Sequence, residues 1–229
     1  MKCHVCLSAY SELGPHIYQC DSCRHVYRTP PVNPLEYHKE GYRKDPKNRR
    51  VKGEFDAHGR PTKAFHRARQ KIVRDRIKII KHYLSRKDSC LDVGAGGGTF
   101  ALAVYPHVAG VDCLEVDPHL AAECRKEFQT YESDIISPKT NGLTYDVIFM
   151  WHVLEHLQQP AAALHKISRM AQRMAFVEIP FGRPIPQRYD GHCHYFSSQS
   201  FEKILSPFNI VEIREGVQKP ARLAILEVK

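Results

Sequence analysis

Short apolar runs alternate with segments of helical apolar spacing from residue 88 to the end of the chain. The runs end at glycine, proline or polar residues, which is typical of buried strands. The ranges that we expect to be strands are 89–93, 107–116, 145–151, 173–179, 209–217 and 221–229. Helices are expected at 118–128 and 160–171, each opened by a proline, and at 197–205, which begins with a serine.

The order of these elements predicts the fold class. Strands that alternate with helices form βαβ units, so we expect an α/β protein with a mostly parallel, Rossmann-like sheet. The last two strands are joined by a short Gln-Lys-Pro link, which favours an antiparallel C-terminal hairpin at one edge. Residues 65–84 predict a further helix that packs on the sheet. Its apolar stripe includes Arg76, and its opposite side is basic.

Charge is concentrated in one part of the chain. The formal net charge is +9, and residues 43–87 hold 17 Lys and Arg against four acidic residues. Such a segment favours an anionic partner, either a nucleic acid, a nucleotide-linked small molecule or an acidic glycan; a solvated basic surface is the alternative. No apolar run approaches the roughly 20 residues of a membrane helix, and the N-terminus lacks a signal-peptide core. We therefore expect a cytoplasmic protein without a membrane span.

Two CxxC pairs, separated by 13 residues, lie near the N-terminus. A tetrahedral structural zinc ion needs four thiolates, and in a short segment the metal replaces a missing core. In a reducing compartment such pairs favour metal binding over disulfides. Unligated thiols and a redox dithiol are the alternatives. The sequence therefore predicts a zinc site at Cys3, Cys6, Cys20 and Cys23.

A glycine cluster follows the first predicted strand of the C-terminal region. LDVGAGGGTF, residues 91–100, lets the backbone turn sharply and approach a ligand closely. It lacks the Lys-Ser or Lys-Thr ending of a P-loop, and a dinucleotide-binding fold of an NAD-dependent oxidoreductase is an alternative. Glu115 closes the next strand about 20 residues later, where an acid accepts hydrogen bonds from ribose hydroxyls. Asp134 follows, in the segment YESDII.

Taken in order, LDVGAGGG, LEVDP, SDI and YDVIFMWHVLEH resemble the four motifs of class I S-adenosylmethionine-dependent methyltransferases. The resemblance covers about residues 88–229 and implies S-adenosylmethionine as the cofactor. For its methionine portion the resemblance implies Asp92, Gly94, Ala95, Gly96 and Gly98. It also implies Glu115 for the ribose, Asp134 with Ile135 for the adenine, and Met150 with Trp151 for the surroundings of the methyl group.

The segment CDSCRHVYRTPPVNPLEYHKEGYRKD, residues 20–45, resembles the lead-in of a methyltransferase subfamily that carries an N-terminal zinc ribbon. Members of this group often methylate sugars, glycans and natural products. The resemblance implies that the ribbon shapes the acceptor side of the pocket. Leu7 and Arg24 stand where a glycine often follows each CxxC knuckle.

WHVLEHL, residues 151–157, places two histidines and a glutamate in an apolar run. On a helix, His152 and His156 would share one face, with Glu155 close by. The pattern, with GHCHYF downstream, resembles the zinc-ribbon subfamily. It is also similar to the ExxEH and later His with which small-RNA terminal 2′-O-methyltransferases hold a divalent metal. Glu155, His156 and His194 match that pattern, and His152 replaces its first glutamate.

Three interpretations of this cluster stay open: a second divalent metal, a histidine general base, or a polar group of residues that lines the pocket. The residues expected near the acceptor are His152, Glu155, His156 and His194. We expect methyl transfer to a hydroxyl of a sugar, glycan or nucleotide-linked small molecule. An RNA 2′-O-methyltransferase and a non-catalytic, cofactor-binding zinc scaffold are the alternatives. The expected domains are a zinc ribbon (1–30), a basic connecting segment (31–87) and a methyltransferase domain (88–229).

Overall fold

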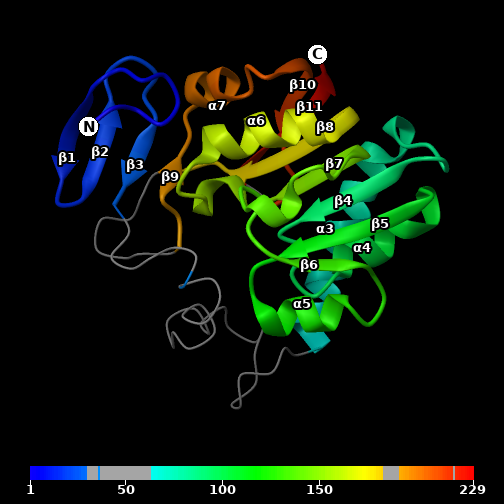
Figure 1. Ribbon diagram of the computed structural model, residues 1–229. Coiled ribbons are helices and arrows are strands. Elements are labelled where there is room, and N and C mark those ends of the chain that lie inside the picture. Colours follow the sequence, from blue (N-terminus) through cyan, green and yellow to red (C-terminus); the bar gives the residue numbers. More distant parts are fainter. Residues whose placement is uncertain (30–35, 37–62, 183–190, 219) are drawn as a thin grey trace.

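The computed structural model describes residues 1–29, 36, 63–182, 191–218 and 220–229, and its main part is a seven-stranded sheet (Figure 1). The strands are β4 (Ser89–Val93), β5 (Gly110–Glu115), β6 (Thr130–Glu132), β7 (Tyr145–Trp151), β8 (Ala171–Pro180), β10 (Phe208–Glu215) and β11 (Ala221–Val228). Their order across the sheet is β10-β11-β8-β7-β4-β5-β6. All neighbours from β6 to β8 are parallel, whereas β11 is antiparallel to both β8 and β10. The predicted Rossmann-like sheet with an antiparallel C-terminal hairpin is confirmed.

Helices cover both faces of this sheet. They are α3 (Lys63–Ile80), α4 (Thr99–Val104), α5 (Pro118–Cys124), α6 (Pro160–Met170) and α7 (Ser198–Ile204). Short 3₁₀ turns are η2 (Lys81–Tyr83), η3 (Tyr105–His107), η4 (Pro138–Thr140) and η5 (Leu154–His156). Alternate residues of a strand point to opposite faces. Accordingly, Ile148 and Met150 of β7 join the core under α6 and α7, whereas Phe149 and Trp151 join the core under α3 and α4.

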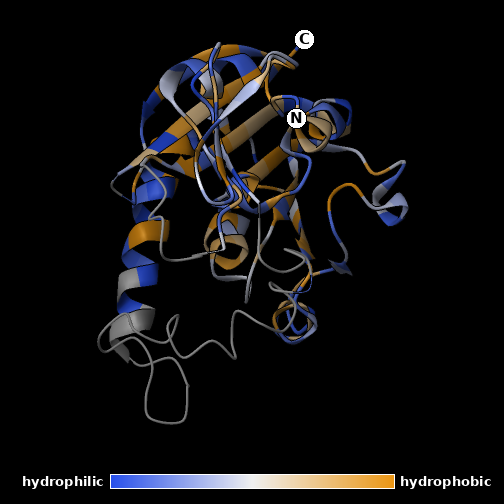
Figure 2. Cartoon of the chain, turned by 90° about the vertical axis from the view of Figure 1, so that its left-hand side faces the viewer, coloured by the Kyte–Doolittle hydropathy of each residue, from blue (hydrophilic) through white to orange (hydrophobic). Residues whose placement is uncertain are grey.

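The predicted basic helix is α3, and it packs on the sheet as expected. Val73, Ile77 and Ile80 are buried in the core that α3 shares with α4. Figure 2 shows hydrophilic and hydrophobic residues alternating along this helix. The exposed basic residues among its described side chains are Arg67, Arg69, Lys71, Arg74 and Lys78. The basic segment spans residues 43–87, and its first part, residues 43–62, lies outside the described residues.

The N-terminal ribbon forms a second, four-stranded sheet. Its strands are β1 (Tyr10–Gly14), β2 (Ile17–Cys20), β3 (Val26–Arg28) and β9 (His194–Tyr195), in the order β1-β2-β3-β9 and all antiparallel. β9 follows β8 along the chain, so the C-terminal region supplies the last strand of the ribbon sheet. Figure 1 shows β9 lying between the ribbon and the main sheet.

The expected domain limits stay predictions. The ribbon limit at residue 30 and most of the connecting segment fall outside the described residues. Within the described part of the chain, no helix is both long and apolar enough to cross a membrane.

Candidate active site

The glycine loop joins β4 to α4 at the carboxyl end of the sheet. The backbone amides of Gly94 and Ala95 both donate to the Leu114 carbonyl of β5, at 2.7 and 3.2 Å. Gly94, Gly96 and Gly98 have φ angles of 70°, 57° and 79°, which L-amino acids with a side chain rarely adopt. The loop is therefore held against β5 in a conformation that depends on glycine.

Glu115, at the end of β5, is tied to this loop. One of its carboxylate oxygens accepts from the Gly96 amide at 2.7 Å, and the other accepts from the Asp117 amide at 2.9 Å. The side chain is buried, and burial is the main reason that its pKa is raised. The structure thus places the predicted ribose ligand beside the glycine loop, as the motif order requires.

Asp92, in β4 immediately before the loop, is only 1% exposed. Its Oδ2 has no hydrogen-bond partner among the described residues. Burial raises the pKa of this carboxyl to about 8, Arg76 opposes the rise, and Glu115 adds to it. A buried carboxyl oxygen without a partner favours a cationic ligand, so the site fits the ammonium group of a bound methionine portion.

Gly94 also makes close contact with the turn that follows β7. A β-carbon added to Gly94 would lie 2.3 Å from Cγ2 of Val153. The glycine loop and the histidine-bearing turn therefore touch directly, which brings the two sequence motifs into one site.

Replacing Gly94 with alanine is expected to lower the free energy of unfolding by about 1–3 kcal/mol, because a positive φ and a steric clash coincide there. Urea denaturation measures this loss. The double variant Gly94→Ala/Val153→Ala should regain part of it, since the second change removes the clashing methyl group. Equal losses in the single and the double variant would show that Val153 does not limit space at the loop.

The other predicted cofactor residues lie at the same edge of the sheet or directly beneath it. Asp134 follows β6, and its Oδ1 accepts from the Ile136 amide at 2.9 Å, while the Ile135 side chain is buried. Met150 is fully buried beneath this edge, and its role beside the cofactor stays a prediction. Trp151 packs against Phe100, with ring centroids 4.9 Å apart, and its role at the cofactor stays a prediction.

A helix that would carry His152 and His156 on one face does not form after β7; the chain makes a turn there instead. His152 follows the last residue of β7 and has a φ of 56°, and only residues 154–156 form a 3₁₀ turn, η5. The His152 amide donates to the Glu178 carbonyl of β8 at 2.8 Å, which holds this strained residue in place. The two histidines therefore do not share one face of a helix.

A buried charge network lies beneath His152. Glu178 is fully buried, and it accepts hydrogen bonds from Arg76 of α3 and from the Val217 amide at 2.8 Å. His152 Nε2 lies 3.0 Å from the same carboxylate, and the Arg76 guanidinium lies 4.6 Å from the centroid of the Trp151 ring. Burial alone would lower the pKa of His152, but the carboxylates of Glu155 and Glu178 raise it to about 9. At neutral pH the network thus contains two cations and two carboxylates.

Glu155 lies at the centre of three imidazoles. It is completely buried, and neither carboxylate oxygen has a hydrogen-bond partner among the described residues. Its Oε1 lies 3.5 Å from His152 Nδ1, 3.8 Å from His156 Nε2 and 4.0 Å from His192 Nε2. Burial pushes the pKa of Glu155 up, but the surrounding imidazoles hold it down at about 2. The cluster is therefore a buried carboxylate within a shell of histidines.

The structure corrects the assignment of His194. This residue lies in β9 with its ring buried, and its Nδ1 lies 3.2 Å from Nε2 of His25 in the ribbon. Nδ1 of His25 lies in turn 2.7 Å from the Tyr10 hydroxyl. His192, two residues earlier, occupies the position beside Glu155 and His156 that was expected for His194.

The ribbon is joined to this cluster through the backbone. The Arg28 amide of β3 donates to the Cys193 carbonyl at 2.8 Å, and the Cys193 amide donates to the Glu155 carbonyl at 2.9 Å. The Ser197 hydroxyl also donates to the Cys23 carbonyl at 2.9 Å. The position of His192 therefore depends on both the ribbon and η5.

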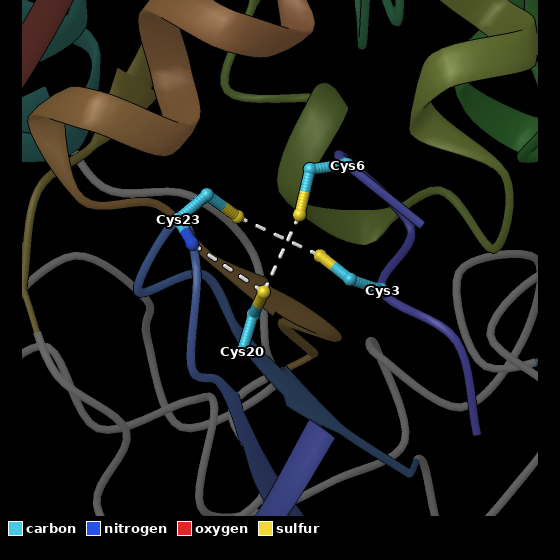
Figure 3. A group of neighbouring side chains, drawn as sticks. All are labelled: Cys3, Cys6, Cys20 and Cys23. Atoms are coloured by element: carbon cyan, nitrogen blue, oxygen red, sulfur yellow. Dashed lines mark hydrogen bonds between the residues drawn. The ribbon is translucent and has the colours of Figure 1, made fainter. Parts of the chain in front are cut away.

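The four N-terminal cysteines point toward one another (Figure 3). The Sγ atoms of Cys3 and Cys23 are 3.6 Å apart, and those of Cys6 and Cys20 are 3.4 Å apart. Zinc–sulfur bonds of about 2.3 Å place tetrahedral ligands roughly 3.8 Å apart, so the four thiols fit a zinc ion. Leu7 and Arg24 adopt φ angles of 64° and 60°, so the knuckle turns form without glycine. Zinc itself stays a prediction that this geometry supports.

The sequence matches the family model described as a methyltransferase domain over residues 65–211, which is more than half of the chain. The chain belongs to this methyltransferase family. No curated protein matches the sequence.

Solved structures similar to the methyltransferase include two enzymes. One is magnesium protoporphyrin IX methyltransferase from Synechocystis PCC 6803 with bound SAM (TM-score 0.63, 14% identity, 88% of this chain and 100% of that chain covered). Another is N-methyltransferase NodS from Bradyrhizobium japonicum WM9 (TM-score 0.56, 16% identity, 72% and 97% covered). At these identities the likeness shows the fold. The prediction of a class I S-adenosylmethionine-dependent methyltransferase with an N-terminal ribbon of four cysteines is confirmed.

Three residues of the methyltransferase site were not singled out from the sequence. Arg76 was placed in the apolar stripe of a helix, where a charged residue already signals a buried partner. Glu178 stands alone as an acid within an apolar strand, which is the matching signal. His192 could not be separated from His194 in GHCH, because the sequence does not show which of the two faces the ribbon.

Proposed function

We propose that the methyltransferase transfers a methyl group from S-adenosylmethionine to a hydroxyl group of an anionic acceptor, a sugar, glycan or nucleotide-linked small molecule. The observation that carries the proposal is the contact between Gly94 and Val153, which brings the histidine cluster to the glycine loop. A hydroxyl must lose its proton during transfer, and imidazoles beside the methyl donor suit that step. Bound S-adenosylmethionine supplies the activated methyl group.

The chain's own residues then have separate tasks. Asp92 and the loop around Gly96 would hold the amino-acid portion of the cofactor, and Glu115 would hold its ribose. His152, fixed between two carboxylates, would orient Glu155. His156 and His192 would face the acceptor, and holding both substrates in line supplies most of the acceleration.

The exposed basic side of α3 supports an anionic acceptor. The same feature supports the competing hypothesis, an RNA 2′-O-methyltransferase. Release of S-adenosylhomocysteine should be measured with a nucleoside diphosphate sugar, the same sugar without phosphate, and an RNA oligonucleotide. We expect turnover with the nucleotide-linked sugar to exceed that with the free sugar at least tenfold. Turnover with RNA alone would favour the competing hypothesis, and cofactor binding with no turnover in any arm would favour a scaffold.

Replacing His156 with alanine should lower turnover at least tenfold while leaving S-adenosylmethionine affinity within about twofold, because the cofactor loop does not depend on this ring. The matched control is His165→Ala, an exposed histidine on α6. Steady-state kinetics and calorimetry measure the two quantities. Unchanged turnover in the His156 variant would refute its role at the acceptor.

Binding of the cationic cofactor beside Asp92 should release a proton. In the protein without cofactor the Asp92 carboxyl has a pKa of about 8, so it is mostly protonated below that pH. The ammonium group of the bound cofactor favours the ionised form of this carboxyl. Affinity should therefore rise about tenfold per pH unit between about pH 6 and 7. Calorimetry in buffers of different ionisation enthalpy measures the proton release. Asp92→Asn should abolish the slope, and an equal slope in that variant would contradict the assignment.

A further inference from the structure

We propose that Glu155, His156 and His192 bind a divalent first-row transition-metal ion, distinct from the ion of the cysteine ribbon. Each of the three offers one ligand atom, and these atoms lie within 4.8 Å of one another. Metal bonds of about 2.1 Å place ligand atoms roughly 3.0–3.4 Å apart in tetrahedral or octahedral sites. The measured 3.8 and 4.0 Å from Glu155 Oε1 to the two Nε2 atoms exceed these separations by about 0.4–1.0 Å, so the side chains would move closer together on binding an ion.

The separation of these atoms argues against direct hydrogen bonds. At 3.8 and 4.0 Å, neither imidazole of His156 or His192 is within hydrogen-bond distance of Glu155. Both oxygens of the fully buried Glu155 side chain lack a hydrogen-bond partner among the described residues. Burying an ionised carboxylate is costly unless a cation lies close to it, and the nearest imidazole among the described residues, that of His152, stays 3.5 Å from Oε1, longer than a charge-assisted hydrogen bond. An ion between the carboxylate and the two rings satisfies this requirement.

The orientation of His156 matches that of a metal ligand. Its Nδ1 lies 2.8 Å from the Gly191 carbonyl, and a carbonyl only accepts, so Nδ1 carries the proton. The Nε2 lone pair is then directed to the Glu155 side. A ligand histidine is typically fixed by such a bond from its other ring nitrogen. Gly191 has a φ of 89°, so the carbonyl that fixes the ring depends on a glycine conformation.

The ligand set determines the class of ion. Two imidazoles and one carboxylate suit zinc, iron, cobalt or manganese rather than calcium or magnesium, which prefer oxygen ligands alone. Three protein ligands leave at least one position open. An acceptor hydroxyl bound there would have a lowered pKa and would lose its proton more readily. This consequence rests on the proposed function, whereas ion binding itself does not.

Cobalt titration of the full chain tests the site. One equivalent of zinc per chain first fills the cysteine ribbon, whose four thiolates bind zinc more tightly than cobalt, and leaves the second site open for the titration. We expect one cobalt ion per chain, whose X-ray absorption shows nitrogen and oxygen neighbours at about 2.0–2.2 Å and no sulfur. Absence of a cobalt ion, or a shell containing sulfur, would overturn the proposal.

Matched variants assign the ligands. His192→Ala alters a partly exposed ring and should weaken cobalt binding at least a hundredfold, whereas His165→Ala should leave it unchanged. Glu155→Gln should have the same effect, and its thermal unfolding reports whether the buried site still folds. Unchanged cobalt affinity in His192→Ala would refute the site. Normal cobalt binding without hydroxyl methylation would overturn the proposed function alone, and histidine-dependent turnover without cobalt binding would overturn the metal site alone.

Discussion

Replacing Arg76 with methionine is expected to lower the free energy of unfolding by about 3–5 kcal/mol, because it removes one of the two cationic partners of the fully buried Glu178 carboxylate. Methionine keeps much of the apolar stem, so the loss reports the charge more than the packing. The guanidinium also covers the Trp151 ring, at 4.6 Å from its centroid. Chemical denaturation at pH 7 measures the effect.

Lys71→Met, on the same helix, is the matched control. Lys71 is paired with Asp75 at 2.7 Å but is 74% exposed, so its removal should cost less than about 1 kcal/mol. The Arg76 variant should also lower turnover, since Glu178 orients His152. A loss as small as that of the Lys71 variant would show that the buried pair does not stabilise the fold.

Replacing Cys20 with serine is expected to remove zinc from the ribbon and to lower methyl transfer at least tenfold, with cofactor affinity unchanged within about twofold. The ribbon has little core beyond the four thiols, so metal loss unfolds it. β9 then loses its partner β3, and His192 loses the support that the Cys193 carbonyl receives from Arg28. The glycine loop instead makes its hydrogen bonds with β5, so it keeps its shape.

Three measurements separate these effects: zinc content, hydrogen exchange of β9, and S-adenosylhomocysteine release. The control is Ser11→Ala, which removes an exposed bond to Asp21 in the same ribbon and should change none of them. If zinc is lost and β9 exchanges rapidly while turnover persists, then the ribbon does not position the site. If the unaltered protein contains no zinc, the predicted zinc site is wrong.

The residues predicted to bind the cofactor and those predicted to face the acceptor belong to different parts of the fold. The predicted ligands of the cofactor's methionine, ribose and adenine portions belong to β4 with its following loop, to β5 and to the segment after β6, within one parallel sheet. The histidine cluster belongs to the turn after β7 and to the chain before β9, which the ribbon holds. Changes in the ribbon are therefore expected to affect the acceptor side of the reaction first.

The sequence by itself determined the sheet, the glycine loop and the cysteine set. These features depend on local patterns: the continuous apolar run of β7, the clustered glycines at 94, 96 and 98, and paired CxxC spacing. Glu115 was also placed correctly at the end of its strand, because the βαβ order brings successive strand ends to one edge.

Only the tertiary structure decided which side chains meet at the histidine cluster. His192 and His194 differ by two positions, and the pairing of β9 with β3 turns the second toward the ribbon. Arg76 and Glu178 are 102 positions apart, so no local pattern links them. Likewise, His152 adopts a positive φ where its amide bonds the Glu178 carbonyl of β8 and the next residue, Val153, packs against Gly94 of the loop after β4. Such contacts follow from packing between distant segments, whose free energy a local sequence pattern does not specify.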